Sequence, residues 1–299
     1  MPTRYDDYDD LATQACERVL VTLLRGLGPW KHCVYLVGGL TPRYLVPNPP
    51  AGVRPHAGTR DVDLVVDLPL LVEVEAYRTL ERNFRDLDLR RATNEDGSRP
   101  SWRWERRTDA HTLVVVELLS DDPGGTVRRA AALPDQRRVS AMHIPHVSII
   151  RDLHDVVEIQ AELLDGRGVV RERIRHADIV SFVCLKALAF DDRLEDKDAY
   201  DLLYCIENGP GGVAAAVQAF HDAIRRTSHG GIIRSALGIL RQRFATDPNT
   251  DGYRKDGPVA VAAFEHDDLP DPDLRILRRR IVSTVIQRLL DGIHDRNRH

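Results

Sequence analysis

The pattern of apolar and polar positions divides the chain into a strand-rich first part and a helix-rich second part. Apolar residues recur at helical spacing over residues 8–28, and continuous apolar runs at 34–38 and 111–119 are typical of buried strands. A third such run, Asp61–Val66, carries two acids at its entrance. From residue 178 onward the spacing is helical. The pattern therefore predicts an α/β (α+β) fold with a mixed sheet and a C-terminal helical domain.

The two acids of the third run, Asp61 and Asp63, are candidate metal ligands. Residues two apart on a strand face the same side, so both carboxylates point one way while Val62 and Leu64 point the other. Two like charges side by side repel unless a cation holds both, and hard oxygen ligands of this kind suit Mg²⁺. The alternative is a solvated strand end, because Asp is common in turns.

Two glycines and a threonine precede these acids. Gly38 and Gly39 follow the first strand run directly, and Thr59 stands two residues before Asp61. Glycine allows the backbone to approach a phosphate, and a helix that opens after such a turn presents N–H groups to an anion. Metal-assisted phosphoryl or nucleotidyl transfer uses a phosphate cradle together with a carboxylate pair. We therefore favour a catalytic role for Asp61 and Asp63 over a solvated strand end.

The Gly-Gly turn and the sequence Thr-Arg-Asp-Val-Asp-Leu at 59–64 resemble the nucleotidyltransferase core of the DNA polymerase β superfamily. Within it, the chain resembles the AbiEii/MenT group of bacterial toxin nucleotidyltransferases. The resemblance implies that Asp61 and Asp63 bind Mg²⁺ or Mn²⁺ and that an NTP is the substrate. The chain departs from the group in the spacer at 46–57, which carries four prolines. We expect this spacer to form a surface loop over the site.

Glu117 is the one carboxylate inside the apolar run at 111–119. A lone carboxylate among apolar residues is costly unless it is paired or bound to a metal. The superfamily uses a third carboxylate on a neighbouring strand, and the resemblance places Glu117 there, as a ligand or a base. The alternative is a salt bridge to one of the nearby arginines.

A second motif lies in the helical part. Lys186 interrupts an apolar helical run, and a charged turn then leads to Lys197-Asp198-Ala-Tyr-Asp201. Asp198 and Asp201 share a helix face, although Lys197 and Asp201 could simply form a surface pair and Lys186 could snorkel to solvent. The AbiEii/MenT group shows a similar arrangement, which implies that Lys186 contacts NTP phosphates while Asp198 or Asp201 supports it or the metal. The chain has four lysines, and two stand here; a compact ammonium suits a phosphate contact.

Composition limits the protein class. A chain of 299 residues, 42% hydrophobic and 29% charged, is typical of a globular protein with one large or two modest domains. The net charge of −4 argues against bulk attraction to nucleic acid but allows a local basic groove. Four cysteines without metal-ligand spacing predict a reducing, cytoplasmic environment. No apolar run reaches the roughly 20 residues of a membrane span, and the acidic start is no signal peptide.

We therefore expect a nucleotidyltransferase domain at residues 1–165 and a helical domain at 166–299 that closes the active-site cleft. The expected reaction is attack by an acceptor hydroxyl on the α-phosphate of an NTP. By family likeness the acceptor is the tRNA 3′ end, and the protein is a toxin with a separately encoded antitoxin. Two alternatives stay open. One is transfer to a small molecule such as an antibiotic, and the other is a non-catalytic relative that binds nucleotide.

Overall fold

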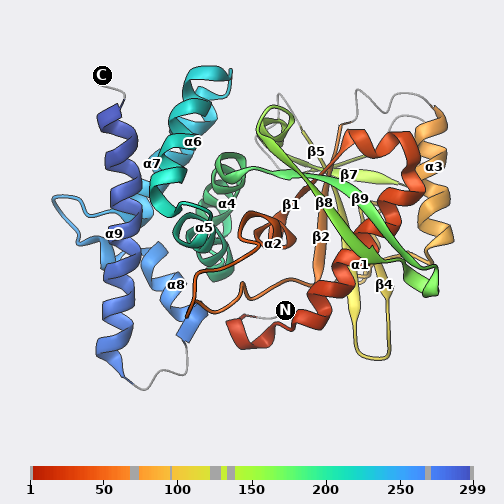
Figure 1. Ribbon diagram of the computed structural model, residues 1–299, viewed down its shortest axis with the longest axis horizontal. Helices are drawn as coiled ribbons and strands as arrows, with labels where there is room; N and C mark the ends of the chain where they lie inside the picture. Colours follow the sequence, from red (N-terminus) through yellow and green to blue (C-terminus); the bar gives the residue numbers. More distant parts are fainter. Residues whose placement is uncertain are drawn as a thin grey trace. The chain divides into compact units, whose positions relative to one another are not determined.

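The computed structural model describes residues 3–67, 74–94, 96–121, 129–132, 139–266 and 271–296. Contacts divide the chain into two compact units, and each is described by itself (Figure 1). The sheet unit comprises Asp9–Thr41 and Gly58–Ala177. The helical unit comprises Met1–Tyr8, Pro42–Ala57 and Asp178–His299.

A mixed sheet forms the centre of the sheet unit. Its strands within the described residues are β1 (Val34–Val37), β2 (Asp61–Val66), β3 (Arg90–Arg91), β4 (Arg103–Arg107), β5 (Leu113–Asp121), β6 (Arg129–Ala132), β7 (Ser140–Ile144), β8 (His154–Glu162) and β9 (Val169–Ala177). They follow the order β3-β4-β5-β2-β1-β9-β8, and β7 pairs with both β5 and β6. β2 runs antiparallel to β1 and parallel to β5, and β9 runs parallel to β1. The predicted class, a mixed sheet followed by C-terminal helices, is confirmed.

Two longer helices accompany the strands of this unit. α1 (Asp10–Leu27) begins after Asp9, whose carboxylate accepts a hydrogen bond from the N–H of Leu11 at 2.8 Å. α1 packs on the sheet and on α3 (Val74–Asp86), and Figure 1 shows both beside the strands. The 3-10 helices of the unit are η2 (Gly28–Cys33), η3 (Gly38–Leu40), η5 (Val147–Arg151) and η6 (Leu164–Gly166). The buried side of α1, which includes Val19, Leu20 and Leu23, supplies much of the core.

The last strand extends the sheet unit past the boundary that we drew at 165/166. β9 pairs with β8 over its whole length and with β1 through Leu36 and His176. The division between the units therefore follows Ala177, and residue 165 lies in the turn between β8 and β9. That the two parts act as separate domains stays a prediction.

The helical unit is built mostly from the C-terminal part of the chain. Its elements are η1 (Tyr5–Asp7), α2 (Pro42–Leu45), α4 (Ile179–Arg193), α5 (Asp196–Asn208), α6 (Gly212–Arg226), α7 (Gly230–Phe244), η7 (Gly252–Arg254), α8 (Asp256–His266) and α9 (Pro272–Arg296). Buried aromatic rings pack between the helices. The ring centroids of Phe190 on α4 and Phe244 on α7, for example, are 5.6 Å apart. None of the helices in the described ranges is both long enough and apolar enough to cross a bilayer.

Candidate functional site

The predicted site residues fall into two groups, one in each unit. The sheet unit contains Gly38, Gly39, Thr59, Asp61, Asp63 and Glu117. The helical unit contains Lys186, Asp198 and Asp201. We call the first group the acidic centre and the second group, with the side chains bonded to it, the lysine centre.

In the acidic centre, the glycine turn after β1 contacts β2, the strand that carries Asp61 and Asp63. The turn follows β1, and the antiparallel register pairs Val37 with Asp63 on β2. Gly38 has a φ of 70°, and a Cβ added there would collide with the carboxylate of Asp63. Only glycine adopts this backbone conformation without strain and also leaves room for the carboxylate. The two halves of the sequence motif are therefore in contact.

The register of β2 and β5 brings the three predicted carboxylates to one face of the sheet. Asp61 and Asp63 are two apart on β2, and Asp63 is directly opposite Glu117 on the parallel strand β5. Residues opposite each other on neighbouring strands face the same side, as do residues two apart on one strand. Val62 and Leu64 are fully buried on the other face, as predicted.

Glu117 is also ion-paired. Its carboxylate lies 3.1 Å from Nε of Arg103, which is opposite it on β4. Arg103 Nε makes no hydrogen bond among the described residues, so the contact has the character of an ion pair. The salt bridge that the sequence left open is therefore present.

The donor set of the acidic centre fits a divalent cation in part. Asp61 and Asp63 offer hard oxygen atoms on one face, which suits Mg²⁺ or Mn²⁺. Within the described ranges, however, no group of three or more His, Cys, Asp or Glu side chains is placed to hold a metal ion. Asp61 and Asp63 thus fit as ligands through their chemistry, and the ligand role of Glu117, which is paired with Arg103, stays a prediction.

Thr59 fixes the backbone that carries the acids. Its hydroxyl accepts a hydrogen bond from the N–H of Asp61 at 3.1 Å, and its own N–H donates to Oγ1 of Thr13 at 3.0 Å. Burial, with the nearby carboxylates of Asp61 and Asp63, raises the pKa of the Cys16 thiol. Cys16 therefore stays a neutral thiol behind the centre. The phosphate contact of Thr59 stays a prediction, as does that of Gly39, which lies in the same turn as Gly38.

The lysine centre joins the second motif into one buried network. The ammonium of Lys186 on α4 lies 2.9 Å from Oδ1 of Asp198 and 2.6 Å from Oδ2 of Asp201, both on α5. Both aspartates are essentially inaccessible, and the Lys186 side chain is 11% exposed. Burial alone would lower the pKa of Lys186, but the two carboxylates raise it, so the ammonium is held charged. Lys186 does not snorkel to solvent.

Three further side chains complete this network. Lys197 contacts both oxygens of Asp201, at 2.9 and 3.0 Å, and is therefore not a surface residue. The guanidinium of Arg193 binds Asp198 through two hydrogen bonds, at 2.6 and 2.9 Å. Nε2 of His56 lies 2.9 Å from Oδ1 of Asp201. Burial on its own would raise the pKa values of both aspartates, but Lys186, together with these partners, lowers them.

The sequence interpretation missed His56 and Arg193. Arg193 is the last residue of α4, five residues before Asp198, in the charged stretch between the two parts of the motif. His56 lies near the end of the proline-rich spacer, and nothing in the local pattern marks it. Most of the spacer is exposed, as expected, but the His56 ring is buried, with Tyr200 stacked on it at 5.3 Å and Tyr204 edge-on at 5.1 Å. Burial lowers the pKa of His56, so the ring is neutral near pH 7.

The charges of the lysine centre balance. Two lysines face two aspartates, and Arg193, which binds Asp198, also lies 3.5 Å from the exposed Glu195. The centre is therefore not negative, and a phosphate would not be repelled. The same network also fastens α4 to α5, so it has a structural role with or without a ligand.

A scan against protein-family models finds no match to this chain, and a search of the curated proteins finds none either. The resemblance to the AbiEii/MenT group therefore stays a prediction.

Proposed function

We propose that this chain is a metal-dependent nucleotidyltransferase that moves a nucleoside monophosphate from an NTP to an acceptor hydroxyl. The proposal rests chiefly on the contact between the Gly38 turn and the carboxylate of Asp63, with Asp61 on the same face. A backbone turn open to a phosphate and a carboxylate pair beside it are what such a transfer requires. A solvated strand end would not need a left-handed glycine against the acid.

The residues of the acidic centre have separate tasks in this proposal. Asp61 and Asp63 would hold Mg²⁺ or Mn²⁺. When bound, the ion would lower the pKa of the acceptor hydroxyl and neutralise charge on the leaving pyrophosphate. Gly38 lets the backbone approach the triphosphate, and Gly39 extends the same turn. The hydrogen bond between Thr59 and Asp61 holds the start of β2 in place.

In the lysine centre, Lys186 would supply positive charge to the phosphates. Asp198 and Asp201 would act as positioning residues, because each holds the ammonium charged and fixes where it lies. Arg193 and His56 fix these two aspartates in turn. The ammonium keeps hydrogen-bonding capacity for a ligand, because Lys carries three donors and two carboxylates contact it.

The acceptor and the biological role follow from family likeness alone. On that basis we propose the 3′ end of tRNA as the acceptor, growth inhibition as the effect, and a separately encoded antitoxin as the partner. A cytoplasmic location belongs to the same proposal.

A second candidate is a non-catalytic relative that binds nucleotide without turnover. The observation that favours it is the ion pair between Glu117 and Arg103, which gives the third carboxylate of the acidic centre a structural partner. On this view the chain would bind NTP but would transfer no nucleotide.

Label transfer from each of four α-labelled NTPs tests the proposal, with Mg²⁺ and total tRNA or a panel of small hydroxyl acceptors. We expect label on tRNA. The double variant Asp61→Asn/Asp63→Asn should lose more than the roughly 10–100-fold typical of outer-shell partners of a metal. Asp155→Asn, which changes an exposed carboxylate on β8, is the matched control and should retain activity.

Other outcomes decide between the candidates. Label on a small acceptor, with none on tRNA, would make the toxin assignment wrong while leaving the reaction type standing. If no acceptor is labelled although NTP binding is detectable, the non-catalytic candidate is correct. Equal labelling by wild type and the double variant would refute the assignment of the acidic centre.

A further inference from the structure

One helix of the helical unit has an apolar stripe that no other described element covers. Eight large hydrophobic side chains are exposed in the described ranges, and five of these are scattered elsewhere in the chain. The other three, Leu274, Leu277 and Ile281, lie on α9 and are 47%, 54% and 41% exposed. Their spacings of three and four residues place them on one helix face. Single exposed apolar residues are ordinary, whereas a contiguous stripe marks an interaction surface.

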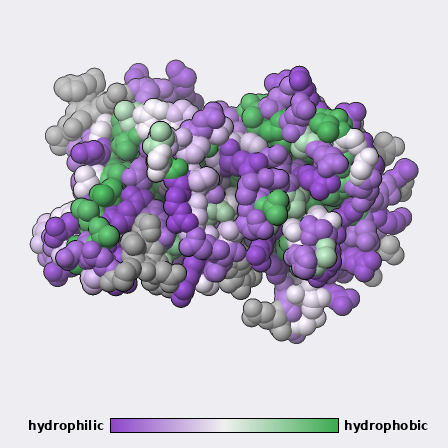
Figure 2. Space-filling model, turned by 60° about the horizontal axis from the view of Figure 1, so that its bottom comes forward, coloured by the Kyte–Doolittle hydropathy of each residue, from purple (hydrophilic) through white to green (hydrophobic). Residues whose placement is uncertain are grey.

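The stripe is not needed for the core of the unit. A different side of α9 carries Val282, Ile286 and Leu289, all fully buried. Figure 2 shows hydrophobic surface at the left-hand end of the molecule, where α9 lies in Figure 1. The helix therefore presents apolar residues on two sides, and packing among the described residues buries only one of them.

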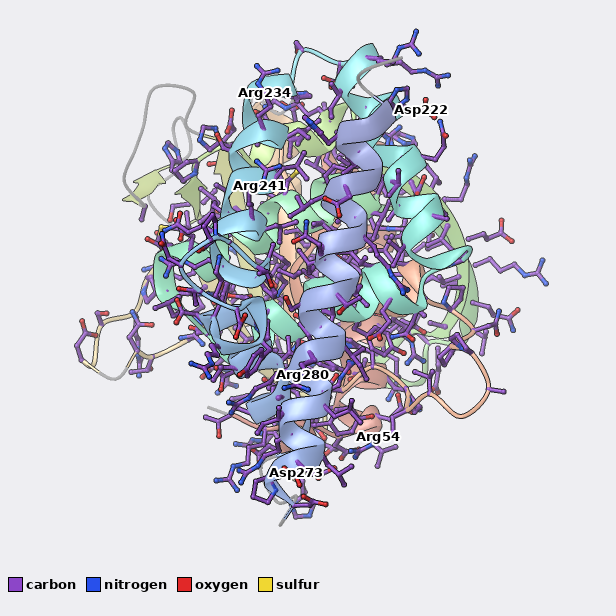
Figure 3. All side chains as sticks on the ribbon, turned by 90° about the vertical axis from the view of Figure 1, so that its left-hand side faces the viewer. Arg54, Asp222, Arg234, Arg241, Asp273 and Arg280 are labelled. Atoms are coloured by element: carbon purple, nitrogen blue, oxygen red, sulfur yellow. The ribbon has the colours of Figure 1, made fainter. Side chains whose placement is uncertain are left out.

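The charges beside the stripe have opposite signs at its two ends. Asp273 and Arg280 are both exposed and stand seven residues apart, which is ~10 Å along a helix (Figure 3). Seven residues are close to two turns, so both charges lie along the same side of α9. The guanidinium of Arg280 lies 5.2 Å from the ring of Tyr253. Arg278 does not add to this surface, because it pairs with Glu207 at 3.0 Å and Glu265 at 2.7 Å.

We propose that the stripe is a self-association surface, on which α9 of a second copy of this chain packs antiparallel about a two-fold axis near Leu277. In such an interface the same patch meets itself, and each contact occurs twice. Leu277 then packs on its own counterpart, Leu274 lies beside Ile281 of the second copy, and Asp273 lies beside Arg280. In this arrangement apolar side chains meet apolar side chains, and each charge meets the opposite charge.

The mixed charge is the reason to choose a second copy over another partner. A uniformly acidic segment would face Asp273, and a uniformly basic one would face Arg280. An antiparallel copy meets both ends with the opposite charge. Three apolar side chains from each copy fall short of the ~800 Å² per partner of a standard interface, so the dimer should be weak and dependent on concentration.

Sedimentation velocity of the full chain tests the proposal over about a hundredfold range of concentration, enough to cross a weak dissociation constant. Wild type should shift from monomer to dimer. Leu277→Glu should stay monomeric, because it places two carboxylates together at the axis. Leu11→Glu changes an isolated leucine on α1 that is 67% exposed, and it should associate as wild type does. Far-ultraviolet circular dichroism verifies that each variant is folded.

A charge-exchange experiment tests the antiparallel arrangement itself. Asp273→Arg and Arg280→Asp should each weaken the dimer, because each brings like charges together. An equimolar mixture of the two variants should associate again, since every contact between them then joins opposite charges. Wild type that remains monomeric at every concentration, or a mixture that does not recover, would overturn the proposal.

Discussion

The carboxylate of Asp201 should be the largest single electrostatic contribution to the stability of the helical unit. It is fully buried and contacts Lys186 at 2.6 Å, Lys197 at 2.9 Å and His56 at 2.9 Å. Asp201→Asn keeps the volume of the side chain but removes its charge. Two ammonium groups that are at most 17% exposed then lose a counter-ion.

The expected cost follows from removing the carboxylate partner of Lys197 and one of the two carboxylates that hold Lys186, which keeps Asp198. Removing one partner of a buried ion pair typically costs about 3–5 kcal/mol, because the charge that remains has lost its solvation as well as its partner. Lys197→Met should cost less, roughly 1 kcal/mol, because Asp201 would keep Lys186 and His56. In the double variant the two effects should not add, since both act on the same network.

Urea unfolding measures these costs, and the chain offers a probe for each unit. All three tryptophans, Trp30, Trp102 and Trp104, belong to the sheet unit. Tryptophan fluorescence therefore reports the sheet unit, whereas far-ultraviolet circular dichroism also follows the helices. We expect Asp201→Asn to shift the circular dichroism transition at least as far as the fluorescence transition.

The pH dependence gives a second check on Asp201. Its folded-state pKa is well below the usual value: burial acts to raise it, but the attached cations outweigh burial. Its contribution is therefore fully present above the unfolded-state pKa of about 3.9 and is lost as pH falls through the folded pKa. The gap in stability between wild type and Asp201→Asn should not shrink from neutral pH to about pH 5. A gap below about 1 kcal/mol at neutral pH, as for a surface pair, would refute the reasoning.

Two more predictions concern Gly38 and His56. Gly38→Ala should lower the free energy of unfolding by more than the about 1–2 kcal/mol of left-handed backbone strain, because its Cβ must also displace the Asp63 carboxylate. Gly39→Ala, in the same turn but without a positive φ, should cost less. Equal costs, measured by fluorescence-detected urea unfolding, would contradict this reasoning. The pKa of His56 is lowered in the folded state, so wild type loses stability as pH falls below about 6.5. The difference in unfolding free energy between wild type and His56→Gln should therefore narrow from pH 8 to pH 5. A constant difference would show that His56 titrates normally.

Local pattern was enough to predict the parts of the acidic centre that lie close in sequence. The alternation on β2 placed Asp61 and Asp63 on one face, and the paired glycines marked the turn after β1. The contact between Gly38 and Asp63 could not be read from the pattern, because it depends on the antiparallel register of two strands joined by a long excursion. The position of Glu117 opposite Asp63 depends likewise on the parallel register of β2 and β5, and it came from the family resemblance.

The sequence was less informative about the partners of the lysine centre. Helical spacing placed Asp198 and Asp201 on one face and Lys186 within a buried helix. His56 joins them from a segment 145 residues away in the chain from Asp201. That segment has no periodicity, and proline-rich composition only indicated a loop. The local sequence pattern indicates which secondary structure a segment can form, but it does not specify which distant side chains the segment will contact.

The scarcity of lysine proved to be a weaker signal than it looked. The two lysines outside the motif are also paired with carboxylates: Lys31 lies 2.6 Å from Glu172, and Lys255 lies 2.7 Å from Asp247. A short bond to an acid therefore does not distinguish Lys186. What distinguishes it is that two inaccessible carboxylates hold one ammonium charged in the interior of the helical unit, whereas Asp247 is 40% exposed and Glu172 shares its charge with Arg25. The argument for a phosphate contact at Lys186 thus rests on burial and charge balance, which only the folded chain supplies.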